Sequence, residues 1–272
     1  MIAAGVAASA GPAWAAPRRI VSLNPCIDVV LVHLADHANI GALSHFARQD
    51  QSSTIADVAR SLPFTYESAE EIIDRSPDLV LASKHSGRAT RQALQRVGIS
   101  VETFGTPNSI AESVGMVQGI AKAIGQVERG DALIARIEAA ISAAAAPAGS
   151  RRIQTLVFQP RGLVAGKGTL VDDMLARAGF ENVAARYGVD RWGSVPLERV
   201  IADPPELMLA PARSVTALTR AERVVSHPAL QSIASRMKRA DFPEACLYCG
   251  GPVLLKTAEM LAKARHEFWS AS

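Results

Sequence analysis

The chain has 272 residues and a net charge of +3 at pH 7, with its basic residues scattered along its length. This scattered charge excludes the concentrated basic surface of a nucleic-acid-binding protein. Beyond the first residues, no run of about 18 strongly apolar residues occurs, and a membrane-spanning helix requires such a run. A chain of this size can bury one large hydrophobic core or two smaller ones.

The N-terminal segment has the features of a targeting sequence. Residues 1–15 are small, apolar and uncharged, and Ala13 and Ala15 flank Trp14 in the small-x-small form of a signal-peptidase site. We therefore predict a signal peptide over residues 1–15 and a periplasmic protein that begins at Ala16; the alternative is an alanine-rich tail. No cysteine stands where a lipoprotein signal needs one, which favours a protein without a lipid anchor.

In the first half of the chain, short apolar runs alternate with stretches of helical periodicity. Ser68 is followed three positions later by Glu71, which is the capping-box pattern of a helix start. Residues 36–50 show neither pattern and are predicted to be a loop. The predicted elements of this half are strand 19–23, helix 28–35, a helix from Ser68, strand 79–82, helix 90–97, strand 99–104 and helix 109–124.

Residues 126–146 are predicted to form one long helix. Their apolar side chains, among them Leu133, Ile134 and Ile137, recur at spacings of three and four, and alanine fills most other positions. Pro147 then ends the helix. At 1.5 Å per residue, a helix of about 20 residues spans roughly 30 Å, the diameter of a small domain. Such a rod is suited to holding two lobes apart.

The second half repeats the alternation of short strands and helices, which predicts a parallel α/β sheet in each half. Its predicted elements are strand 154–158, helix 169–178, helix 195–202, strand 206–210, a helical stretch from His227, and a final helix that follows Pro252 and runs to about Phe268.

The two halves also contain one unit twice. An aromatic residue, Phe64 or Trp192, stands six positions before a glutamate, Glu70 or Glu198. Seven positions after each glutamate, a Pro-acid-Leu step opens an apolar run. Each residue of the second copy lies 128 positions after its match in the first. This ordered match without gaps predicts a duplicated structural unit.

These patterns predict an α/β protein with two Rossmann-like lobes, each built on a parallel sheet, joined by a single long spacer helix. The N-terminal lobe is predicted over residues 16–125, the spacer helix over residues 126–146, and the C-terminal lobe over residues 147–272. Because the link is a stiff rod, we expect closure of the lobes to be small.

In open α/β sheets, ligands bind outside the carboxyl ends of the strands, so the site is expected in a cleft between the lobes. Phe64 and Trp192 are predicted to be matched aromatic walls for a flat ligand, the alternative being that each packs in a core. The other candidate ligand-binding residues, all in loops, are Asn24, Pro25, Cys26, Lys84, His85, Arg88, Gln159, Arg161, Tyr248 and Cys249.

The three cysteines are Cys26, Cys246 and Cys249. In an oxidising compartment Cys246 and Cys249 are expected to pair, which leaves Cys26 without a partner. Three thiols without a nearby histidine do not make a zinc site, so we predict no metal site and no cofactor. The six histidines are dispersed, and His45 and His85 are the two candidates for ligand contact.

The sequence contains no complete example of the enzyme motifs considered. The run Gly166-Lys167-Gly168-Thr169 resembles a phosphate-binding loop, but a glycine separates the lysine from the threonine, whereas a Walker loop needs them adjacent. Neither a Gly-x-Ser-x-Gly nucleophile elbow nor a His-Glu-x-x-His metal helix occurs. No catalytic residue is predicted.

The early Arg-Ile-Val-Ser-Leu-Asn-Pro run, the Glu-x-Ile-Ile-x-x-x-Pro-Asp-Leu-Val-Leu motif and the duplicated unit resemble the class III periplasmic binding proteins. These serve ABC importers of vitamin B12, iron–siderophores and haem. The likeness is greatest to cobalamin-binding members, which carry an aromatic residue six positions before a docking glutamate in each lobe. The first of these aromatics is Trp in those proteins, where this chain has Phe64. The resemblance assigns docking on the arginines of a permease dimer to Glu70 and Glu198.

The resemblance implies a periplasmic substrate-binding protein without chemistry of its own. It would capture a metal chelate, either a corrinoid such as cobalamin or an iron–siderophore, and deliver it to an ABC permease dimer in the inner membrane. One alternative is a haem carrier that takes a metal ligand from Tyr187, Tyr248 or His85. The other is an enzyme on a related two-lobed fold that uses Cys and His residues of the cleft.

Overall fold

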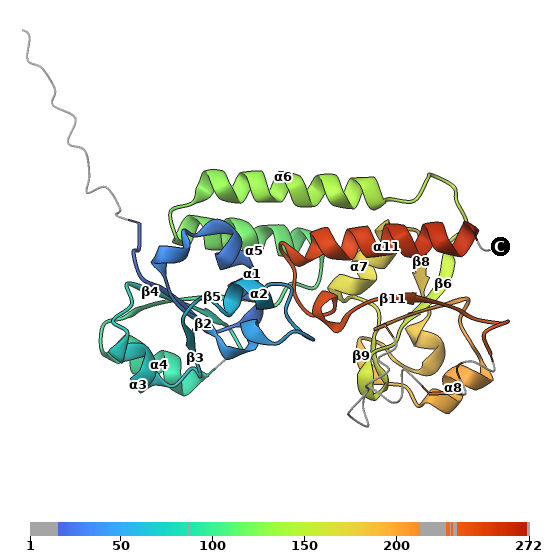
Figure 1. The fold of residues 1–272 in the computed structure, drawn as a ribbon, viewed down its shortest axis with the longest axis horizontal. Helices are drawn as coiled ribbons and strands as arrows, with labels where there is room; N and C mark the ends of the chain where they lie inside the picture. The colour runs from blue at the N-terminus through green and yellow to red at the C-terminus, as the bar shows by residue number, and fades with distance from the viewer. Residues whose placement is uncertain (1–15, 86, 213–226, 229, 231–232, 271–272) are drawn as a thin grey trace, which may run out of the picture.

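The computed structural model describes residues 16–85, 87–212, 227–228, 230 and 233–270. It shows two lobes side by side beneath a layer of long helices (Figure 1). The predicted signal peptide lies outside the described residues, and the helical stretch predicted from His227 lies only partly within them. Within the described residues, no helix combines the length and the hydropathy needed to cross a membrane.

The N-terminal lobe is built on a five-stranded parallel sheet in the order β3-β2-β1-β4-β5. The central strands β1 and β4 are fully buried, as expected of parallel strands covered on both faces. The elements of this lobe are β1 (Ile20–Ser22), α1 (Pro25–Leu34), β2 (Ile40–Ser44), α2 (Ala56–Ala59), β3 (Phe64–Thr65), α3 (Ala69–Asp74), β4 (Leu79–Ser83), α4 (Arg88–Arg96) and β5 (Ser100–Phe104).

Strand β2 lies within residues 36–50, where the sequence predicts a loop, so that prediction is wrong. Two 3₁₀ turns, η1 (His37–Asn39) and η2 (His45–Arg48), flank the strand. Gly41 and Ala42 occupy two of its five positions, which leaves only a weak strand pattern in the sequence. The strand forms because β1 and β3 supply hydrogen-bonding partners on both sides of it.

Three long helices form a layer over both lobes: α5 (Ile110–Ala123), α6 (Val127–Ala144) and α11 (Val253–Ser270). In Figure 1, α6 runs across the top of both lobes with α5 and α11 beneath it. The helix predicted over residues 126–146 is therefore confirmed, although it begins one residue later and ends two residues earlier than predicted. Gly130 allows α6 to approach α5 closely, because an added Cβ would lie 2.5 Å from the Cβ of Ala121.

The C-terminal lobe has a four-stranded parallel sheet in the order β11-β10-β6-β8. The prediction of parallel sheets in two lobes is thus confirmed. An antiparallel pair, β7–β9, lies outside this sheet and was not predicted. The elements of this lobe are β6 (Ile153–Val157), η3 (Pro160–Gly162), β7 (Leu163–Ala165), α7 (Leu170–Arg177), β8 (Phe180–Asn182), η4 (Ala184–Tyr187), β9 (Trp192–Ser194), α8 (Leu197–Ala202), β10 (Leu207–Ala210), β11 (Lys238–Asp241) and η5 (Glu244–Cys246).

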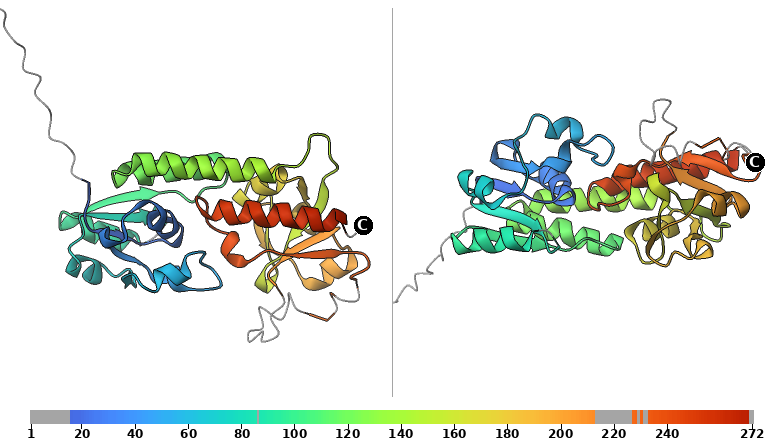
Figure 2. Two further views of the ribbon diagram at one scale, coloured as in Figure 1. Left: turned by 45° about the horizontal axis from the view of Figure 1, so that its top comes forward. Right: turned by 90° about the horizontal axis from the view of Figure 1, so that it is seen from below.

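One hydrophobic core extends through both lobes beneath the helical layer. Its buried members include Val30 of α1, Ile120 of α5, Ile137 of α6, Val157 of β6 and Leu261 of α11. Because this core is continuous, the helical side of the molecule is one packed body. Smaller cores fill the other face of the sheet in each lobe. Figure 2 shows the lobes and the helices that bridge them from two further sides.

Candidate ligand-binding cleft

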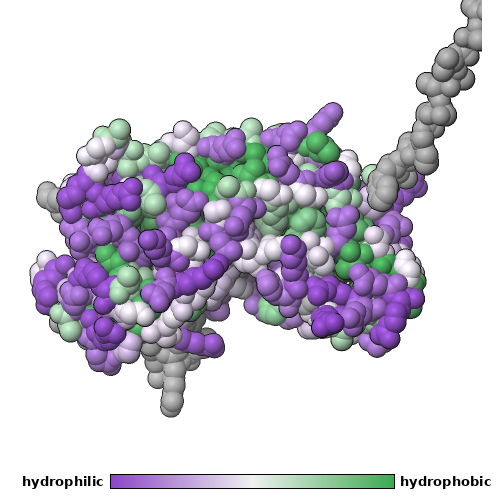
Figure 3. All heavy atoms as spheres, turned by 180° about the vertical axis from the view of Figure 1, so that it is seen from behind, coloured by the Kyte–Doolittle hydropathy of each residue, from purple (hydrophilic) through white to green (hydrophobic). Residues whose placement is uncertain are grey.

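The candidate cleft lies between the lobes, on the side away from α6. In the space-filling view the lobes form separate bulges with a notch between them (Figure 3). Strand β1 ends at Ser22 and leads through Asn24 into the first turn of α1, where Cys26 is bonded to Cys249 of the other half of the chain. The carboxyl end of the N-terminal sheet therefore faces the second lobe, which is where open α/β sheets bind ligands.

A disulfide between Cys26 and Cys249 joins the lobes, with Cα atoms 4.9 Å apart. The predicted pairing of Cys246 with Cys249 is therefore wrong. Cys246 is a buried free thiol beside Thr257, and burial raises its pKa. The bonded cysteines are 223 positions apart in sequence, so only the tertiary fold brings them together.

Asn24 and Pro25 begin helix α1 and fix the position of Cys26. The Oδ1 atom of Asn24 accepts hydrogen bonds from the backbone N–H groups of Cys26 at 3.0 Å and Ile27 at 3.3 Å. Pro25 occupies the first turn, where a helix has no use for its missing N–H. Both residues thus shape the start of α1, and the Asn24 side-chain oxygen is engaged in capping it.

In the C-terminal half of the chain, Trp192 and Tyr248 form an aromatic wall. Trp192 lies on β9 with 43% of its surface exposed, and its ring stacks on that of Tyr248 with centroids 6.1 Å and planes 23° apart. Burial and the neighbouring Glu244 carboxylate raise the pKa of Tyr248 to about 12, and its hydroxyl donates to Glu244 Oε1 at 3.4 Å. The phenol therefore stays neutral at physiological pH, and the wall presents ring faces rather than a phenolate.

On the N-terminal lobe, His45, Phe46, Phe64 and Tyr66 form what we call the N-lobe aromatic cluster. The His45 ring lies 3.9 Å from Phe46 and 5.2 Å from Tyr66, and Phe64 meets Tyr66 edge-on at 5.4 Å. The Arg48 guanidinium covers the half-buried Phe64 ring at 3.9 Å, whereas Tyr66 is 70% exposed. Tyr66, which the sequence analysis missed, is thus the exposed ring. Its position two residues after Phe64 was the available signal, since alternate residues of an extended chain share a face.

Two carboxyl groups lie beside this cluster. Asp28 is fully buried in the first turn of α1 and accepts hydrogen bonds from the Ser44 N–H at 3.2 Å and the Ser44 hydroxyl at 2.5 Å. Burial raises the pKa of Asp28 to about 7 in spite of these bonds. Burial also raises the pKa of Glu67, while the charge of His45 opposes that shift. Among the described residues, His45 Nδ1 is buried without a hydrogen-bond partner.

Basic side chains follow the strand ends of both lobes. Lys84, His85 and Arg88 follow β4, Arg161 follows β6, and all four are exposed. Lys84 also lines a shallow cavity of about 280 Å³ beside β5. Gln159, by contrast, is buried, and its Nε2 donates to a carbonyl oxygen just beyond β11 at 3.1 Å. Gln159 therefore holds its loop in place, whereas the other four side chains are exposed to solvent.

Tyr187 is not placed to bind a ligand, so its suggested role in a haem carrier is wrong. The side chain is packed in the core of the C-terminal lobe, and its hydroxyl donates to the backbone oxygen of Asp203 at 2.6 Å. The position of Tyr187 in a polar stretch of the sequence did not indicate this burial. Tyr248 and His85 remain exposed among the three suggested metal ligands.

Glu70 and Glu198 lie on the outer helices α3 and α8, and both are exposed. In Figure 1 these helices lie toward opposite ends of the lower edge, one on each lobe. The duplicated unit therefore places one carboxylate on each lobe along the same edge of the molecule.

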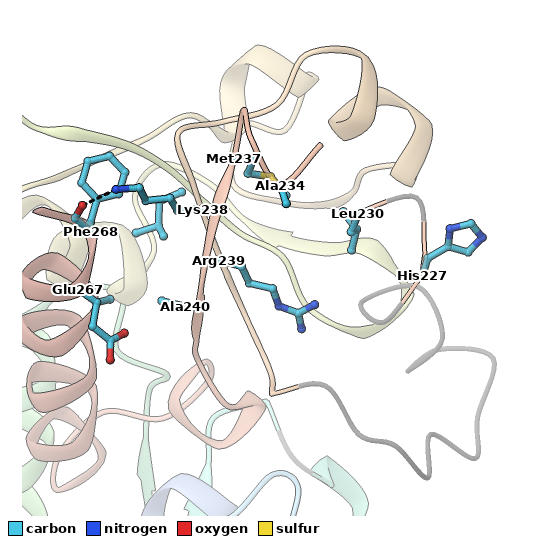
Figure 4. Close-up of a pocket in the computed structure, with 11 residues that line it drawn as sticks. His227, Leu230, Ala234, Met237, Lys238, Arg239, Ala240, Glu267 and Phe268 are labelled. Atoms are coloured by element: carbon cyan, nitrogen blue, oxygen red, sulfur yellow. Dashed lines mark hydrogen bonds between the residues drawn. The ribbon is translucent and has the colours of Figure 1, made fainter. Parts of the chain in front are cut away.

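A separate cavity of about 420 Å³ lies on the C-terminal lobe between β11 and the end of α11 (Figure 4). Leu230 and Phe268 form part of its wall. Lys238 Nζ donates to the Phe268 carbonyl oxygen at 2.6 Å, and Arg239 donates to the carbonyl oxygen of Pro211. The protein's own carbonyls thus hold these two cations within the lobe, and Glu267 and His227 are further polar residues of the lining.

The described residues contain no group of three or more His, Cys, Asp or Glu side chains arranged to hold a metal ion. The described part of the chain thus consists of two α/β lobes and a bridging helical layer, with aromatic side chains on each lobe.

Comparison with known proteins identifies the family to which this chain belongs. A family model described as periplasmic binding protein matches residues 20–236, which is most of the chain. The chain therefore belongs to the periplasmic binding proteins, a family of solute-binding proteins rather than enzymes, which indicates a periplasmic location. No curated protein sequence matches the chain.

Solved structures share its class III fold. The periplasmic heme-binding protein RhuT from Roseiflexus sp. RS-1, in apo form, has a TM-score of 0.72 at 24% identity, over 93% of this chain and 98% of that one. The periplasmic heme-binding protein HutB of Vibrio cholerae has a TM-score of 0.71 at 19% identity, over 90% and 97%. The periplasmic vitamin B12-binding protein BtuF of Vibrio cholerae has a TM-score of 0.68 at 15% identity, over 93% and 98%. At these identities the likeness shows the fold alone.

Proposed function

We propose that this protein is the substrate-binding component of an ABC importer and captures a metal-bound tetrapyrrole, a corrinoid such as cobalamin or a haem, between its lobes. The observation that carries the proposal is the presence of exposed rings at the cleft on both lobes. Trp192 and Tyr248 stack on one side, and Tyr66 presents the N-lobe aromatic cluster on the other. Ring faces of this kind suit a large, flat, conjugated ligand.

The related structures support a tetrapyrrole. RhuT and HutB are described as heme-binding and BtuF as vitamin B12-binding, and both ligands carry their metal in a ring that supplies most of its ligands. Such a ligand needs few metal-binding side chains from the protein. This agrees with the lack of a three-residue metal group among the described residues.

The exposed cationic side chains also suit a second candidate ligand, an iron–siderophore. Lys84, Arg88 and Arg161 favour a ligand with negative groups, which haem has as propionates and which many iron–siderophores also have. For haem, the iron would take an axial ligand from the protein. Tyr66 and His45 are better placed for this than Tyr248, because the raised pKa of Tyr248 makes its phenolate costly to form.

We also propose that Glu70 and Glu198 dock the loaded protein on the permease dimer. Two carboxylates, one on each lobe and along one edge, would fix its orientation on a partner with two-fold symmetry. Complementary charge of this kind gives register and association rate more than affinity. The simpler alternative is that each is a first-turn acid favoured by its helix dipole.

Titration of the purified protein with hemin, cyanocobalamin and a ferric siderophore tests the proposed ligand. Binding is expected to raise the melting temperature, since a ligand at 100 times its dissociation constant stabilises the folded state by about 2.7 kcal/mol. Haem held through Tyr66 is expected to show a Soret band that shifts in Tyr66→Phe. If only the ferric siderophore stabilises the protein, the second candidate is correct; if none of the three does, the proposal is wrong.

A further inference from the structure

The chain around Cys249 belongs to the C-terminal half but is fastened to the N-terminal lobe. Cys249 is bonded to Cys26 in the first turn of α1. Two positions later, the Gly251 N–H donates to the Ser113 hydroxyl of α5 at 2.6 Å. An added Cβ at Gly251 would also lie 2.8 Å from Val30 of α1, so the backbone sits directly on the N-terminal helices. This stretch of chain should therefore move with the N-terminal lobe.

Tyr248 directly precedes this anchor, and its carbonyl oxygen lies 3.8 Å from Cys26 Sγ. Its ring stacks on Trp192, which lies on β9 of the C-terminal lobe and pairs there with β7. The aromatic wall thus consists of one ring fastened to the N-terminal lobe and one ring carried by the C-terminal lobe. A change in the separation of the lobes must change the geometry of this stack.

We infer that the Cys26–Cys249 disulfide is a positioning element of the cleft: it holds Tyr248 against the N-terminal lobe, so that the aromatic wall keeps its shape and its ligand affinity only while the bond is intact. The affinity part rests on the proposed function, whereas the geometric part does not. The physical reason is preorganisation, because a ring that is already fixed loses less freedom when the ligand binds.

The bond can be removed without separating the lobes. A dithiol reductant supplies two electrons and two protons, becomes a disulfide itself, and leaves Cys26 and Cys249 as thiols. The core through α5, α6 and α11 does not depend on the bond and should keep the lobes together. Cys246 is buried, and its raised pKa lowers the thiolate fraction that attacks disulfides, so it is not expected to replace Cys26.

The test compares the wild type with Cys26→Ser/Cys249→Ser and with Cys246→Ser, a matched control that removes a cysteine outside the bridge. Each protein is measured as purified and after reduction with dithiothreitol, which is removed under argon before any ligand is added. The first readout is Trp192 emission without ligand, obtained by subtracting the spectrum of Trp192→Phe. The second is the affinity for hemin and for cyanocobalamin.

Loss of the bridge is expected to change Trp192 emission before ligand is added and to weaken binding about three- to tenfold, the effect of freeing one side chain. Reduced wild type should match the double variant and gives the same test if that variant fails to fold. Cys246→Ser should match the wild type, and dithiothreitol should not affect the double variant. Unchanged Trp192 emission would overturn the inference, and unchanged affinity would overturn its affinity part. If neither probe binds oxidised wild type, the proposed function fails, and Trp192 emission alone decides the geometric part.

Discussion

The two lobes follow one plan except at the edge that carries the aromatic walls. Helices α3 and α8 cover Ala69–Asp74 and Leu197–Ala202, so both ends differ by 128 positions. Strands β4 and β10 begin at Leu79 and Leu207, with the same offset. The strand order β2-β1-β4-β5 of one lobe corresponds to β8-β6-β10-β11 of the other. The sequence repeat is therefore a repeat of structure.

The acid of the Pro-acid-Leu step has the same task in both copies. Asp78 Oδ2 accepts hydrogen bonds from the backbone N–H groups of Arg18 and Arg19, both at 2.8 Å. Glu206 Oε2 accepts one from the N–H of Gln154 at 2.9 Å and is also bonded to Arg151. Each acid thus fastens the chain at the start of the first strand of its own lobe, β1 or β6.

The two copies of the repeat differ in structure around Phe64 and Trp192. Strand β3, which carries Phe64, pairs with β2 as the fifth strand of its sheet, and Arg48 covers the ring. Strand β9, which carries Trp192, leaves the parallel sheet and pairs antiparallel with β7, where the ring meets Tyr248. Equal positions in the repeat thus have unequal surroundings. The scaffold and its outer edge are therefore repeated, whereas the surroundings of the two aromatic rings are built separately in each lobe.

The docking proposal requires the outer edges of the copies to be equivalent, and it predicts the largest effect. Glu70→Arg with Glu198→Arg is expected to keep ligand affinity and abolish uptake in a reconstituted importer, because like-charge contacts at an interface can cost several kcal/mol. The two single variants should lose similar, smaller amounts of uptake. Glu128→Arg with Glu138→Arg, on exposed positions of α6, provides a control with the same charge change. Normal uptake by the first double variant would contradict the docking roles, and loss of ligand binding would place these residues in the cleft.

Buried charge distinguishes the lobes further. Asp28 is a buried carboxylate of the N-terminal lobe, and the described part of the C-terminal lobe buries none. Its folded pKa of about 7 lies above its ordinary value of 3.8, so the folded state holds a proton that the unfolded state releases between these values. Stability should therefore fall by a few kcal/mol as the pH rises from about 4 to about 7.

Melting measurements from pH 5 to pH 8 check this effect, with Asp28→Asn as the comparison. The variant should lose the fall attributed to Asp28, because it cannot ionise at this position. Glu71 and Glu206 have lowered pKa values, so their contributions change at more acidic pH. The pKa of Glu67 is raised by burial, so Glu67 contributes a fall of the same sign, which the wild type and the variant share. An equal fall in both proteins would show that Asp28 is not its source.

Much of the fold was predictable because it depends on local patterns. The apolar runs after the Pro-acid steps marked β4 and β10, and the helical periodicity marked α6 to within two residues at each end. Strand β2 was missed because its two partners, rather than its own Gly41 and Ala42, make it a strand. Short pairs such as β7–β9 depend in the same way on chain that is distant in sequence.

The candidate site was less predictable, since it consists of long-range pairs. Trp192 was found through the repeat, but its stacking partner Tyr248 is far away in sequence and was proposed only as a separate residue. The cysteine pairing was wrong for the same reason, because the nearer Cys246 is turned into the core beside Thr257. Neither the stack nor the disulfide leaves a periodic signal.

Alanine substitution at Phe64 and Trp192 sharpens the contrast between the two rings. Trp192→Ala is expected to weaken ligand binding at least tenfold, about 1.5 kcal/mol, with little change in melting temperature, because an exposed stacked ring is lost. Phe64→Ala should lower the melting temperature more than the affinity, because it removes packing under Arg48. Titration and thermal melting of both variants check this, and bound ligand should quench Trp192 fluorescence in the wild type. Equal effects of the two variants on affinity would mean that the rings are matched walls after all.

The smallest effect tests whether the repeated anchors act independently. Asp78→Asn and Glu206→Gln keep the side-chain shape but remove the charge that strengthens the hydrogen bonds to β1 and β6, so each should cost about 1 kcal/mol of unfolding free energy. Denaturant unfolding of both single variants and the double variant measures this. Because the acids fasten different lobes, the two losses should add to within about 0.5 kcal/mol. A larger interaction would show that the continuous core couples the lobes so strongly that damage at one first strand is felt at the other. In that event the molecule is two copies in sequence and architecture but a single unit in its folding energetics.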